Sequence, residues 1–370
     1  MTRARPRVVL APDAFKGNHD PVQVAAAWTK ALAEVARLDP RPISDGGDGF
    51  LAVLLHYRPD LLEARARVPD PLGRSIDATW AWDPDRRTAW VESAAAVGLR
   101  LVERGERRPL DADSAGLGRL LLTIGGLGVR RLTVGLGGSA TVDGGLGLAR
   151  GLGFRFEDAR GRPVRRPGEL DRLSRITPPG GPPPLPSVVT ALADVDHPLL
   201  GPGGAAAAFG PQKGATPAQV ERLEAGLARL AERWVADLGA PAALAAARGT
   251  GAAGGLGGAL VAFLGARLTP GSAWMARRAA LGRALDRADL VLTGEGRFDA
   301  GSLAGKGTGR VIREARRRGL PVAVVCARAE GPVPAGVVIV DAGDDPGRLS
   351  PEDLGRLARR AFGRLVNGLP

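Results

Sequence analysis

Acidic residues gather in short turn-like stretches at three places in this 370-residue chain. They are Asp45 and Asp48 in "SDGGDG", Asp194 and Asp196 in "ADVDHPLL", and Glu295 and Asp299, with Arg297 between them, in "TGEGRFDAGS". Carboxylates on such turns suit Mg²⁺, because this ion prefers oxygen ligands and fills its shell with phosphate oxygens and water. Each acid alone is equally typical of an ordinary turn or helix cap.

Lysine is rare and unusually placed. Of the 51 Lys and Arg residues only four are lysine, and Lys16, Lys213 and Lys306 each stand next to a glycine. Lysine is a compact charge on a flexible stem, whereas arginine is a planar fork, so lysine suits close contact with a single phosphate or carboxylate oxygen. Lys16 also follows Asp13 by three residues, just behind an apolar run. We therefore predict that these three lysines are functional groups.

A glycine-rich stretch, "TVGLGGSATVDGGLGLARGLGF" at 133–154, runs from a strand pattern into a helix pattern. Glycines let backbone N–H groups approach an anion, and a helix N-terminus favours negative charge, so a phosphate cradle is one interpretation. Two others stay open: a dinucleotide fingerprint, which is partly matched, and a turn that serves packing alone. The candidate anion-binding residues are Gly135, Gly137, Gly138, Ser139 and Asp143.

The elements that position these residues are predicted to form an α/β fold with a largely parallel sheet, because short β-branched runs alternate with helical patterns. The clearest helices are expected at 20–36, at 216–238 and from 350 onward, each opening on an N-cap residue followed by proline. Ligands of open parallel sheets bind beyond the carboxyl ends of the strands, so the acids, lysines and glycines are expected to converge on one crevice. The expected strands are 7–11, 88–92, 131–135, 187–193, 288–293, 320–326 and 336–341.

Two domains are expected from the length and from the similar strands near the two chain ends. A discontinuous domain of residues 1–72 plus 286–370 is predicted, with 73–285 inserted as a second α/β domain that carries the glycine-rich stretch. The proline-rich segment 157–186 is predicted to be a surface excursion or linker.

Composition narrows the function classes. A net charge of +12 is compatible with nucleic-acid binding, but the arginines are interspersed with acids and only 4% of residues are aromatic, so no nucleic-acid partner is expected. A non-catalytic basic binding protein is the alternative from another class. No apolar run is long enough for a membrane span, and a single cysteine excludes an intramolecular disulfide. We therefore expect a cytoplasmic protein with no membrane partner.

Six stretches follow one another between residue 8 and about residue 315: "APDAFKG", "SDGGDG", "GLGGSATVDGGLGLARGLG", "ADVDHPLLGPGGAAAAFGPQKGAT", "GTGAAGGLGGAL" and "ADLVLTGEGRFDAGSLAGKG". Together they resemble the signature stretches of bacterial glycerate kinases of the glyoxylate and glucarate pathway type. The resemblance implies ATP-dependent phosphorylation of D-glycerate, usually at the 2-hydroxyl, with Mg²⁺. It also implies two α/β domains, one of them flavodoxin-like and discontinuous, with the active site in the cleft between them.

Roles for the residues in these stretches follow from their chemistry. As catalytic residues we expect Asp194 to accept the hydroxyl proton, and Lys16 and Lys306 to meet phosphate or the substrate carboxylate. The expected metal ligands are Asp45, Asp48 and Asp196. Substrate or phosphate binding is assigned to Asp13, Gly135, Gly137, Gly138, Ser139, Asp143, Lys213, Glu295, Arg297 and Asp299.

The chain departs from the family pattern at several positions, among them Leu117, Arg119, Gly301 and Thr308. Leu117 lacks a hydroxyl, Arg119 reverses a charge, and Gly301 stands where glutamine is common. A kinase of a related small hydroxy acid is therefore one alternative, and a dinucleotide-dependent oxidoreductase is another. A monomer or a homodimer is expected.

Overall fold

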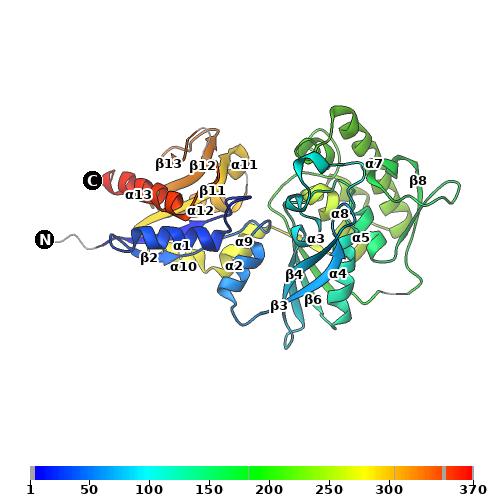
Figure 1. Cartoon of the computed structure of the whole chain (residues 1–370), viewed down its shortest axis with the longest axis horizontal. Helices are drawn as coiled ribbons and strands as arrows, with labels where there is room; N and C mark the ends of the chain where they lie inside the picture. The colour runs from blue at the N-terminus through cyan, green and yellow to red at the C-terminus, as the bar shows by residue number, and fades with distance from the viewer. Residues whose placement is uncertain (1–4, 182, 304, 344–346, 369–370) are drawn as a thin grey trace. The chain divides into compact units, whose positions relative to one another are not determined.

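The computed structural model describes residues 5–181, 183–303, 305–343 and 347–368. The chain divides into two compact units: residues 1–59 with 270–370, which we call the terminal unit, and residues 60–269, the central unit. The central unit interrupts the terminal one in sequence, so both chain ends belong to the terminal unit (Figure 1). Each unit has its own main sheet.

Five parallel strands form the sheet of the terminal unit. Their spatial order is β13-β12-β11-β1-β2, and every neighbouring pair is parallel. Counted along the chain this is the order 2-1-3-4-5, the flavodoxin-like form of the doubly wound sheet. The strands are β1 (Arg7–Pro12), β2 (Arg37–Pro40), β11 (Leu290–Asp299), β12 (Val322–Glu330) and β13 (Val337–Asp341).

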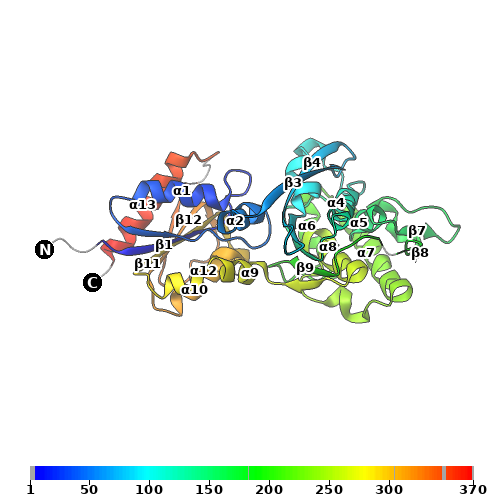
Figure 2. The same ribbon diagram turned by 90° about the horizontal axis from the view of Figure 1, so that it is seen from below.

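Helices cover both faces of this sheet. Successive residues of β1 point to opposite faces, and since residues 8–11 are all apolar, each face must be packed against helices. Val8 and Leu10 pack with α1 and α13, which lie side by side (Figures 1 and 2). Val9 and Ala11 share a second apolar core with α10 and α12. The helices of the terminal unit are α1 (Pro21–Leu32), α2 (Phe50–Tyr57), α9 (Gly271–Arg278), α10 (Leu281–Leu285), α11 (Ala300–Leu303), α12 (Gly307–Arg316) and α13 (Pro351–Asn367).

The central unit contains a mixed six-stranded sheet in the order β10-β9-β6-β5-β4-β3. The pairs β3–β4 and β4–β5 are antiparallel, whereas β5, β6, β9 and β10 pair in parallel. A separate two-stranded ribbon joins β7 and β8. The strands are β3 (Leu62–Pro69), β4 (Ser75–Asp83), β5 (Thr88–Glu92), β6 (Arg131–Gly135), β7 (Arg155–Asp158), β8 (Leu173–Thr177), β9 (Val188–Leu192) and β10 (Arg267–Thr269).

Apolar residues of helices α4 and α8 pack against this mixed sheet in one core, and α7 forms a second core with the ribbon. Helix α7 begins where the sequence predicts, because Thr216 accepts a hydrogen bond from the Gln219 N–H, and Gly239 ends it with a φ of +68°. The helices of the central unit are α3 (Ala94–Val97), α4 (Ala115–Gly126), α5 (Leu146–Gly151), α6 (Ala205–Phe209), α7 (Pro217–Leu238) and α8 (Ala252–Leu264).

The expectation of a linker over 157–186 is wrong for much of that segment. Residues 173–177 form β8, and a 3₁₀ turn at Pro167–Arg172 precedes it. Leu170, Leu173 and Ile176 are buried in the core that α7 closes. The apolar residues spaced through this polar segment therefore supply a buried face.

The two units meet in sequence at positions other than the expected domain limits of 1–72 plus 286–370 and 73–285. The first junction is at 59/60, because the whole of β3 pairs with β4 of the central sheet. The second is at 269/270, because α9 and α10 contact α12 of the terminal unit. Strand β3 therefore belongs to the central unit, and helices α9 and α10 belong to the terminal unit, the reverse of what the sequence predicts.

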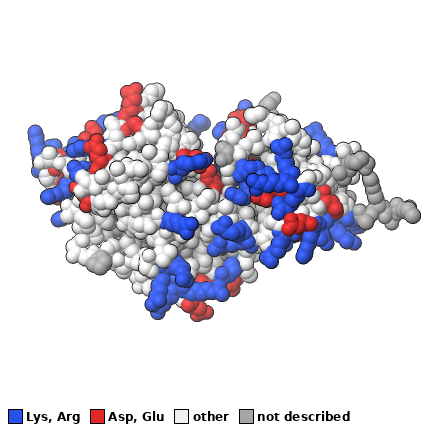
Figure 3. Space-filling model, turned by 180° about the vertical axis from the view of Figure 1, so that it is seen from behind, with Lys and Arg blue, Asp and Glu red and all other residues white. Residues whose placement is uncertain are grey.

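On the face drawn in Figure 3, Lys and Arg side chains lie in several separate groups, some of them beside Asp and Glu, with neutral surface between the groups. Many of the described arginines form ion pairs with acids, such as Arg74 with Asp70 and Arg162 with Asp158. Within the described ranges, no helix is long and apolar enough to cross a bilayer.

Candidate active site

The carboxyl ends of β1 and β11 in the terminal unit carry an acid–lysine cluster. It consists of Asp13, Lys16, Asp45, Asp48, Glu295 and Lys306. Asp13 follows β1 directly, and its N–H donates to the Gly294 carbonyl of β11 at 2.8 Å. This places the Asp13 carboxylate at the edge where ligands of parallel sheets bind.

Glycine at position 307 is what allows helix α12 to approach Asp13. A Cβ at Gly307 would overlap Asp13 Oδ2 and lie 2.9 Å from the Ile43 side chain. Lys306 is the N-cap residue of this helix, so it stands beside the same carboxylate-bearing edge. Close packing thus explains Gly307, one of the two glycines that flank Lys306 in the sequence.

Charges within the cluster perturb one another. Burial, followed by the neighbouring charges of Asp45 and Glu295, raises the pKa of Asp13 well above its ordinary value. The Asp45 carboxylate is the main cause that raises the pKa of Lys16, with smaller contributions from Asp13 and Asp48. Lys16 therefore stays positively charged among acids. The ionised form of Asp13, in contrast, is disfavoured by burial and by the like charges of its neighbours.

Glu295 is the most constrained acid of the cluster. It is 8% exposed, and its Oε1 has no hydrogen-bond partner among the described residues. Burial raises its pKa, and the charge of Lys306 and hydrogen bonds from Ser302 and Thr308 oppose that rise. A buried carboxylate oxygen without a partner is costly, so Glu295 Oε1 is a site at which a donor or cation would bind favourably.

Arg297 and Asp299, also predicted to bind substrate, lie at the far end of β11. Asp299 Oδ1 is 3.9 Å from Lys306 Nζ, and Asp299 also exchanges hydrogen bonds with Ser302. Arg297 is exposed and pairs with Asp299 at 3.3 Å and with Glu330 at 3.8 Å. Asp299 thus borders the cluster, whereas Arg297 is held by acids.

The expected metal ligands divide between the two units. Asp45 is half-buried, and its Oδ1 accepts the Gly47 N–H at 2.8 Å in a local turn, with Asp48 close by. Asp196 belongs to the central unit, where both of its carboxylate oxygens accept hydrogen bonds from Arg248. Among the described residues, no group of three or more His, Cys, Asp or Glu side chains is arranged to hold a metal ion.

In the central unit, the glycine-rich stretch forms the loop from β6 to α5. Gly135 ends β6, Gly137 and Gly138 are half-buried, and Gly138 has a φ of +60°. Gly144 and Gly145 have φ values of +58° and +74°, and a Cβ at either would overlap side chains of α7 or α8. The second glycine pair therefore serves packing, which leaves the segment around Gly137 and Gly138 as the candidate anion cradle.

Lys213 is a buried residue that supports this loop by hydrogen bonds. Its side chain is 3% exposed, and its Nζ donates to Ser139 Oγ at 2.9 Å and to the Thr141 carbonyl at 2.7 Å. Burial lowers its pKa to about 7, and the charge of Asp143 opposes this shift. Lys213 and Ser139 thus contact each other, and the buried amine supports the loop rather than presenting a charge at the surface.

Asp143 is fully buried and organises the start of helix α5. Its carboxylate accepts hydrogen bonds from the Ser114 hydroxyl at 2.6 Å, and from the N–H groups of Ser114, Gly145 and Gly147 at 3.1, 3.0 and 2.9 Å. A side chain with four such donors holds the loop in shape and does not reach an outside ligand. Ser114, which the sequence analysis missed, is signalled only by its place before a helix pattern.

Asp194 lies just behind β9, two residues past its last residue, Leu192. It is half-buried, whereas Asp196 is exposed and its pKa is lowered by the hydrogen bond from Arg248. The predicted site residues therefore form two groups. One is the acid–lysine cluster of the terminal unit, and the other is the loop, Lys213 and Asp194 of the central unit.

The terminal unit has a flavodoxin-like sheet with an acid–lysine cluster at its carboxyl edge, and the central unit is a second α/β unit with a glycine loop, so the chain is a two-unit α/β protein with a candidate ligand site at the carboxyl end of a parallel sheet. Residues 8–336 match the model of the glycerate kinase family. The chain therefore belongs to this family and is an enzyme of this kind.

Individual relatives agree with that assignment. The glycerate kinase of Halalkalibacterium halodurans is 37% identical over 326 residues, which cover 86% of this chain and 84% of the relative. The glycerate 2-kinase of Escherichia coli K12 is 37% identical over 85% of this chain and 84% of its own length. A crystal structure from Salmonella typhimurium LT2, assigned to glycerate kinase 2, superposes with a TM-score of 0.75 at 33% identity, covering 98% and 99% of the two chains.

Proposed function

We propose that this enzyme transfers the γ-phosphoryl group of ATP to the 2-hydroxyl of D-glycerate, giving 2-phosphoglycerate. The observation that carries the proposal is the acid–lysine cluster at the carboxyl edge of a doubly wound sheet, with the unpartnered Glu295 Oε1 inside it. Phosphoryl transfer depends on such positioned charges more than on covalent chemistry by the protein. The family assignment and the relative from Escherichia coli, named glycerate 2-kinase, support the same reaction.

In the terminal unit, Lys16 and Lys306 are the proposed cationic groups. Each is a flexible ammonium next to glycine, and both are near acids that keep them charged. A compact ammonium meets one phosphate or carboxylate oxygen at short range, which suits a triphosphate tail or the carboxylate of a small acid. Asp13 and Glu295 hold the two lysines in place and, with their raised pKa values, limit the negative charge that faces the ligand.

In the central unit, Asp194 is the proposed proton acceptor for the attacking hydroxyl. It is half-buried behind a parallel strand, where a carboxylate reaches a ligand without losing all its hydration. The backbone N–H groups around Gly137 and Gly138 are proposed to contact phosphate oxygens. Lys213 contributes by holding Ser139 and Thr141, and therefore the loop, in one conformation.

The residues of the terminal unit also fit a magnesium ion that accompanies ATP. Asp45 and Asp48 are half-buried carboxylates with hard oxygen donors, and Mg²⁺ in nucleotide sites commonly uses only one or two carboxylates. Asp45 and Asp48 suit this role better than Asp196, because Arg248 engages both oxygens of Asp196. When bound, Mg²⁺ would neutralise charge on the phosphate oxygens.

The proposal is tested by measuring ADP release with Mg-ATP and a panel of small acids: D-glycerate, L-glycerate, lactate and tartronate. We expect ADP release that depends on D-glycerate and is weak with lactate, which lacks the terminal hydroxyl. Strong turnover with another hydroxy acid alone would assign the enzyme to a related substrate. Reduction of NAD or NADP by glycerate without ADP release would replace the kinase by the oxidoreductase.

A further inference from the structure

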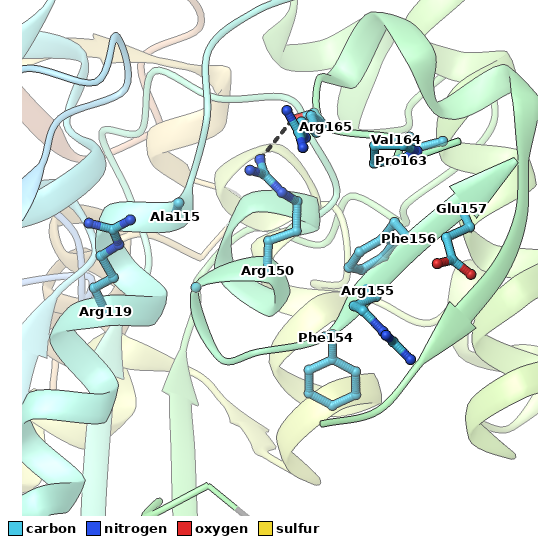
Figure 4. A pocket seen from close by; sticks show the side chains of 11 residues that line it. Ala115, Arg119, Arg150, Phe154, Arg155, Phe156, Glu157, Pro163, Val164 and Arg165 are labelled. Atoms are coloured by element: carbon cyan, nitrogen blue, oxygen red, sulfur yellow. Dashed lines mark hydrogen bonds between the residues drawn. The ribbon is translucent and has the colours of Figure 1, made fainter. Parts of the chain in front are cut away.

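A cavity of about 430 Å³ lies within the central unit, and no residue of the loop between β6 and α5 lines it. Its walls come from the start of α4, the end of α5, strand β7 and the segment 163–165 (Figure 4). Phe154, Phe156, Pro163 and Val164 give it an apolar side, and Phe156 and Val164 are buried. None of the residues to which we assign substrate or metal lines it.

The charged residues of the cavity are strongly biased towards arginine. Arg119, Arg150, Arg155 and Arg165 line it, with Glu157 as the single acid. In Figure 4 the side chains of Arg119 and Arg155 lie on opposite sides of Arg150. Four guanidinium groups around one hollow produce a positive potential that attracts anions.

Most of this charge is not neutralised by the protein. Among the described residues, the guanidinium groups of Arg119, Arg155 and Arg165 form no hydrogen bond or ion pair. Arginines just outside the cavity differ: Arg162 pairs with Asp158 at 2.7 Å, and Arg172 pairs with the same carboxylate at 3.3 Å. Arg119, Arg155 and Arg165 are also exposed, so their guanidinium groups are accessible to an anion from solution.

Arg150 connects the cavity to the glycine loop. Its Nη1 donates to Asp113 Oδ2 and to the Arg165 carbonyl, both at 2.8 Å, and the second contact is drawn in Figure 4. Asp113 Oδ1 accepts the Ala115 N–H at 2.7 Å. Ser114, which follows Asp113 in the chain, donates its N–H and its hydroxyl to the Asp143 carboxylate. Asp143 in turn holds the loop and the start of α5.

We propose that this cavity, the arginine pocket, is a second binding site, which takes a small organic phosphate and stabilises the glycine loop through Arg150, Asp113 and Ser114. Guanidinium forks match phosphate oxygens in pairs, and the phenylalanine side accepts the organic part of the ligand. The ligand binds the N–H groups of Arg150 that do not contact Asp113, so it holds the Arg150 side chain in the orientation in which Nη1 donates to Asp113. The site is independent of the proposed reaction, because neither the binding nor its effect on the loop involves glycerate or ATP.

Isothermal titration calorimetry with phenyl phosphate, which carries both a phosphate and an apolar ring, tests the binding. We expect saturable binding to the wild type that is tighter than that of inorganic phosphate and weakens as salt is added. The double variant Arg119→Ala/Arg155→Ala should lose at least about tenfold in affinity, whereas Glu157→Gln should bind more tightly. Arg267→Ala, which removes an exposed arginine of β10 away from the cavity, is the matched control and should bind like the wild type.

Hydrogen exchange tests the connection to the loop. Saturating phenyl phosphate should slow exchange of the Gly145 and Gly147 amides, which donate to Asp143, in the wild type but not in the double variant. Equal affinity of the wild type and the double variant, or no binding by the folded wild type, overturns the site. Binding that leaves both amides unchanged overturns the connection.

Discussion

Replacing Lys213 by methionine should change how the stability of the protein depends on pH. Methionine fills a similar volume but cannot donate to Ser139 Oγ or to the Thr141 carbonyl. It also removes a buried amine whose pKa in the folded protein is about 7, against 10.5 for a free lysine. The two effects are separable, because only the second depends on pH.

The sign follows from proton binding. Between about pH 7 and pH 10.5 the unfolded lysine is protonated while the folded amine has lost its proton, so the unfolded state binds more protons and stability rises with pH. Below about pH 7 both states are protonated, and the penalty for burying the charge is present in full. At about 1.4 kcal/mol per pH unit, and half-protonation of the folded amine at pH 7, the wild type gains about 2 kcal/mol relative to Lys213→Met between about pH 7 and pH 9.

Urea unfolding of the wild type and of Lys213→Met at several pH values measures this difference. Lys30→Met, which removes an exposed lysine of α1, corrects for any general effect of losing a lysine and should follow the wild type. A gap between the wild type and Lys213→Met that stays constant from about pH 7 to pH 9 would show that Lys213 titrates like an exposed lysine. In that case the buried support of the loop, as described here, is wrong.

Three further substitutions test other parts of the account. Ser114→Ala removes two buried hydrogen bonds at the start of α5 and should lower the free energy of unfolding by about 1–3 kcal/mol, as urea titration would show. Gly307→Ala pushes a methyl group against the Asp13 carboxylate and should lower kcat/KM by about 10²-fold, whereas Gly126→Ala, which meets no neighbour, should leave it unchanged. Asp194→Asn should lower kcat by about 10²–10⁴-fold with an unchanged far-ultraviolet circular dichroism spectrum, and near-normal turnover would refute its role as proton acceptor.

The sequence predicts seven of the thirteen described strands and the clearest helix starts because these depend on local chemistry, whereas it does not predict β2, β3, β4, β7, β8 or β10. Every expected strand is present, and Asp20 caps α1 through the N–H groups of Val22 and Gln23 as the residue pattern indicates. Helix ends are less local: α1 was expected to reach residue 36 but ends at Leu32. The sequence does not predict the ribbon β7–β8, because its apolar residues are widely spaced and form a buried face only when α7 packs against them.

The candidate site shows the same division. Residue type and turn position select the acid–lysine cluster, since carboxyl ends of parallel strands lie at one edge of a sheet. The same reasoning cannot tell a ligand-binding acid from a structural one. The sequence predicts Asp143 as a phosphate-binding residue, yet its carboxylate accepts hydrogen bonds from two loop N–H groups and from the hydroxyl of Ser114. Ser114 lies 29 positions earlier in the chain, so only folding brings it next to Asp143.

Proton-coupled phosphorus NMR of a reaction that contains the enzyme, Mg-ATP and D-glycerate is the most direct test of the proposed reaction. A phosphate on the 2-hydroxyl is attached to a carbon with one hydrogen, so its signal should be split into two lines, with an area equal to that of the ADP formed. Inorganic phosphate as the only new signal besides those of ADP, or no new signal while ATP stays intact, would contradict phosphoryl transfer to glycerate. A three-line signal would instead place the phosphate on the terminal hydroxyl and contradict the assignment of the 2-position.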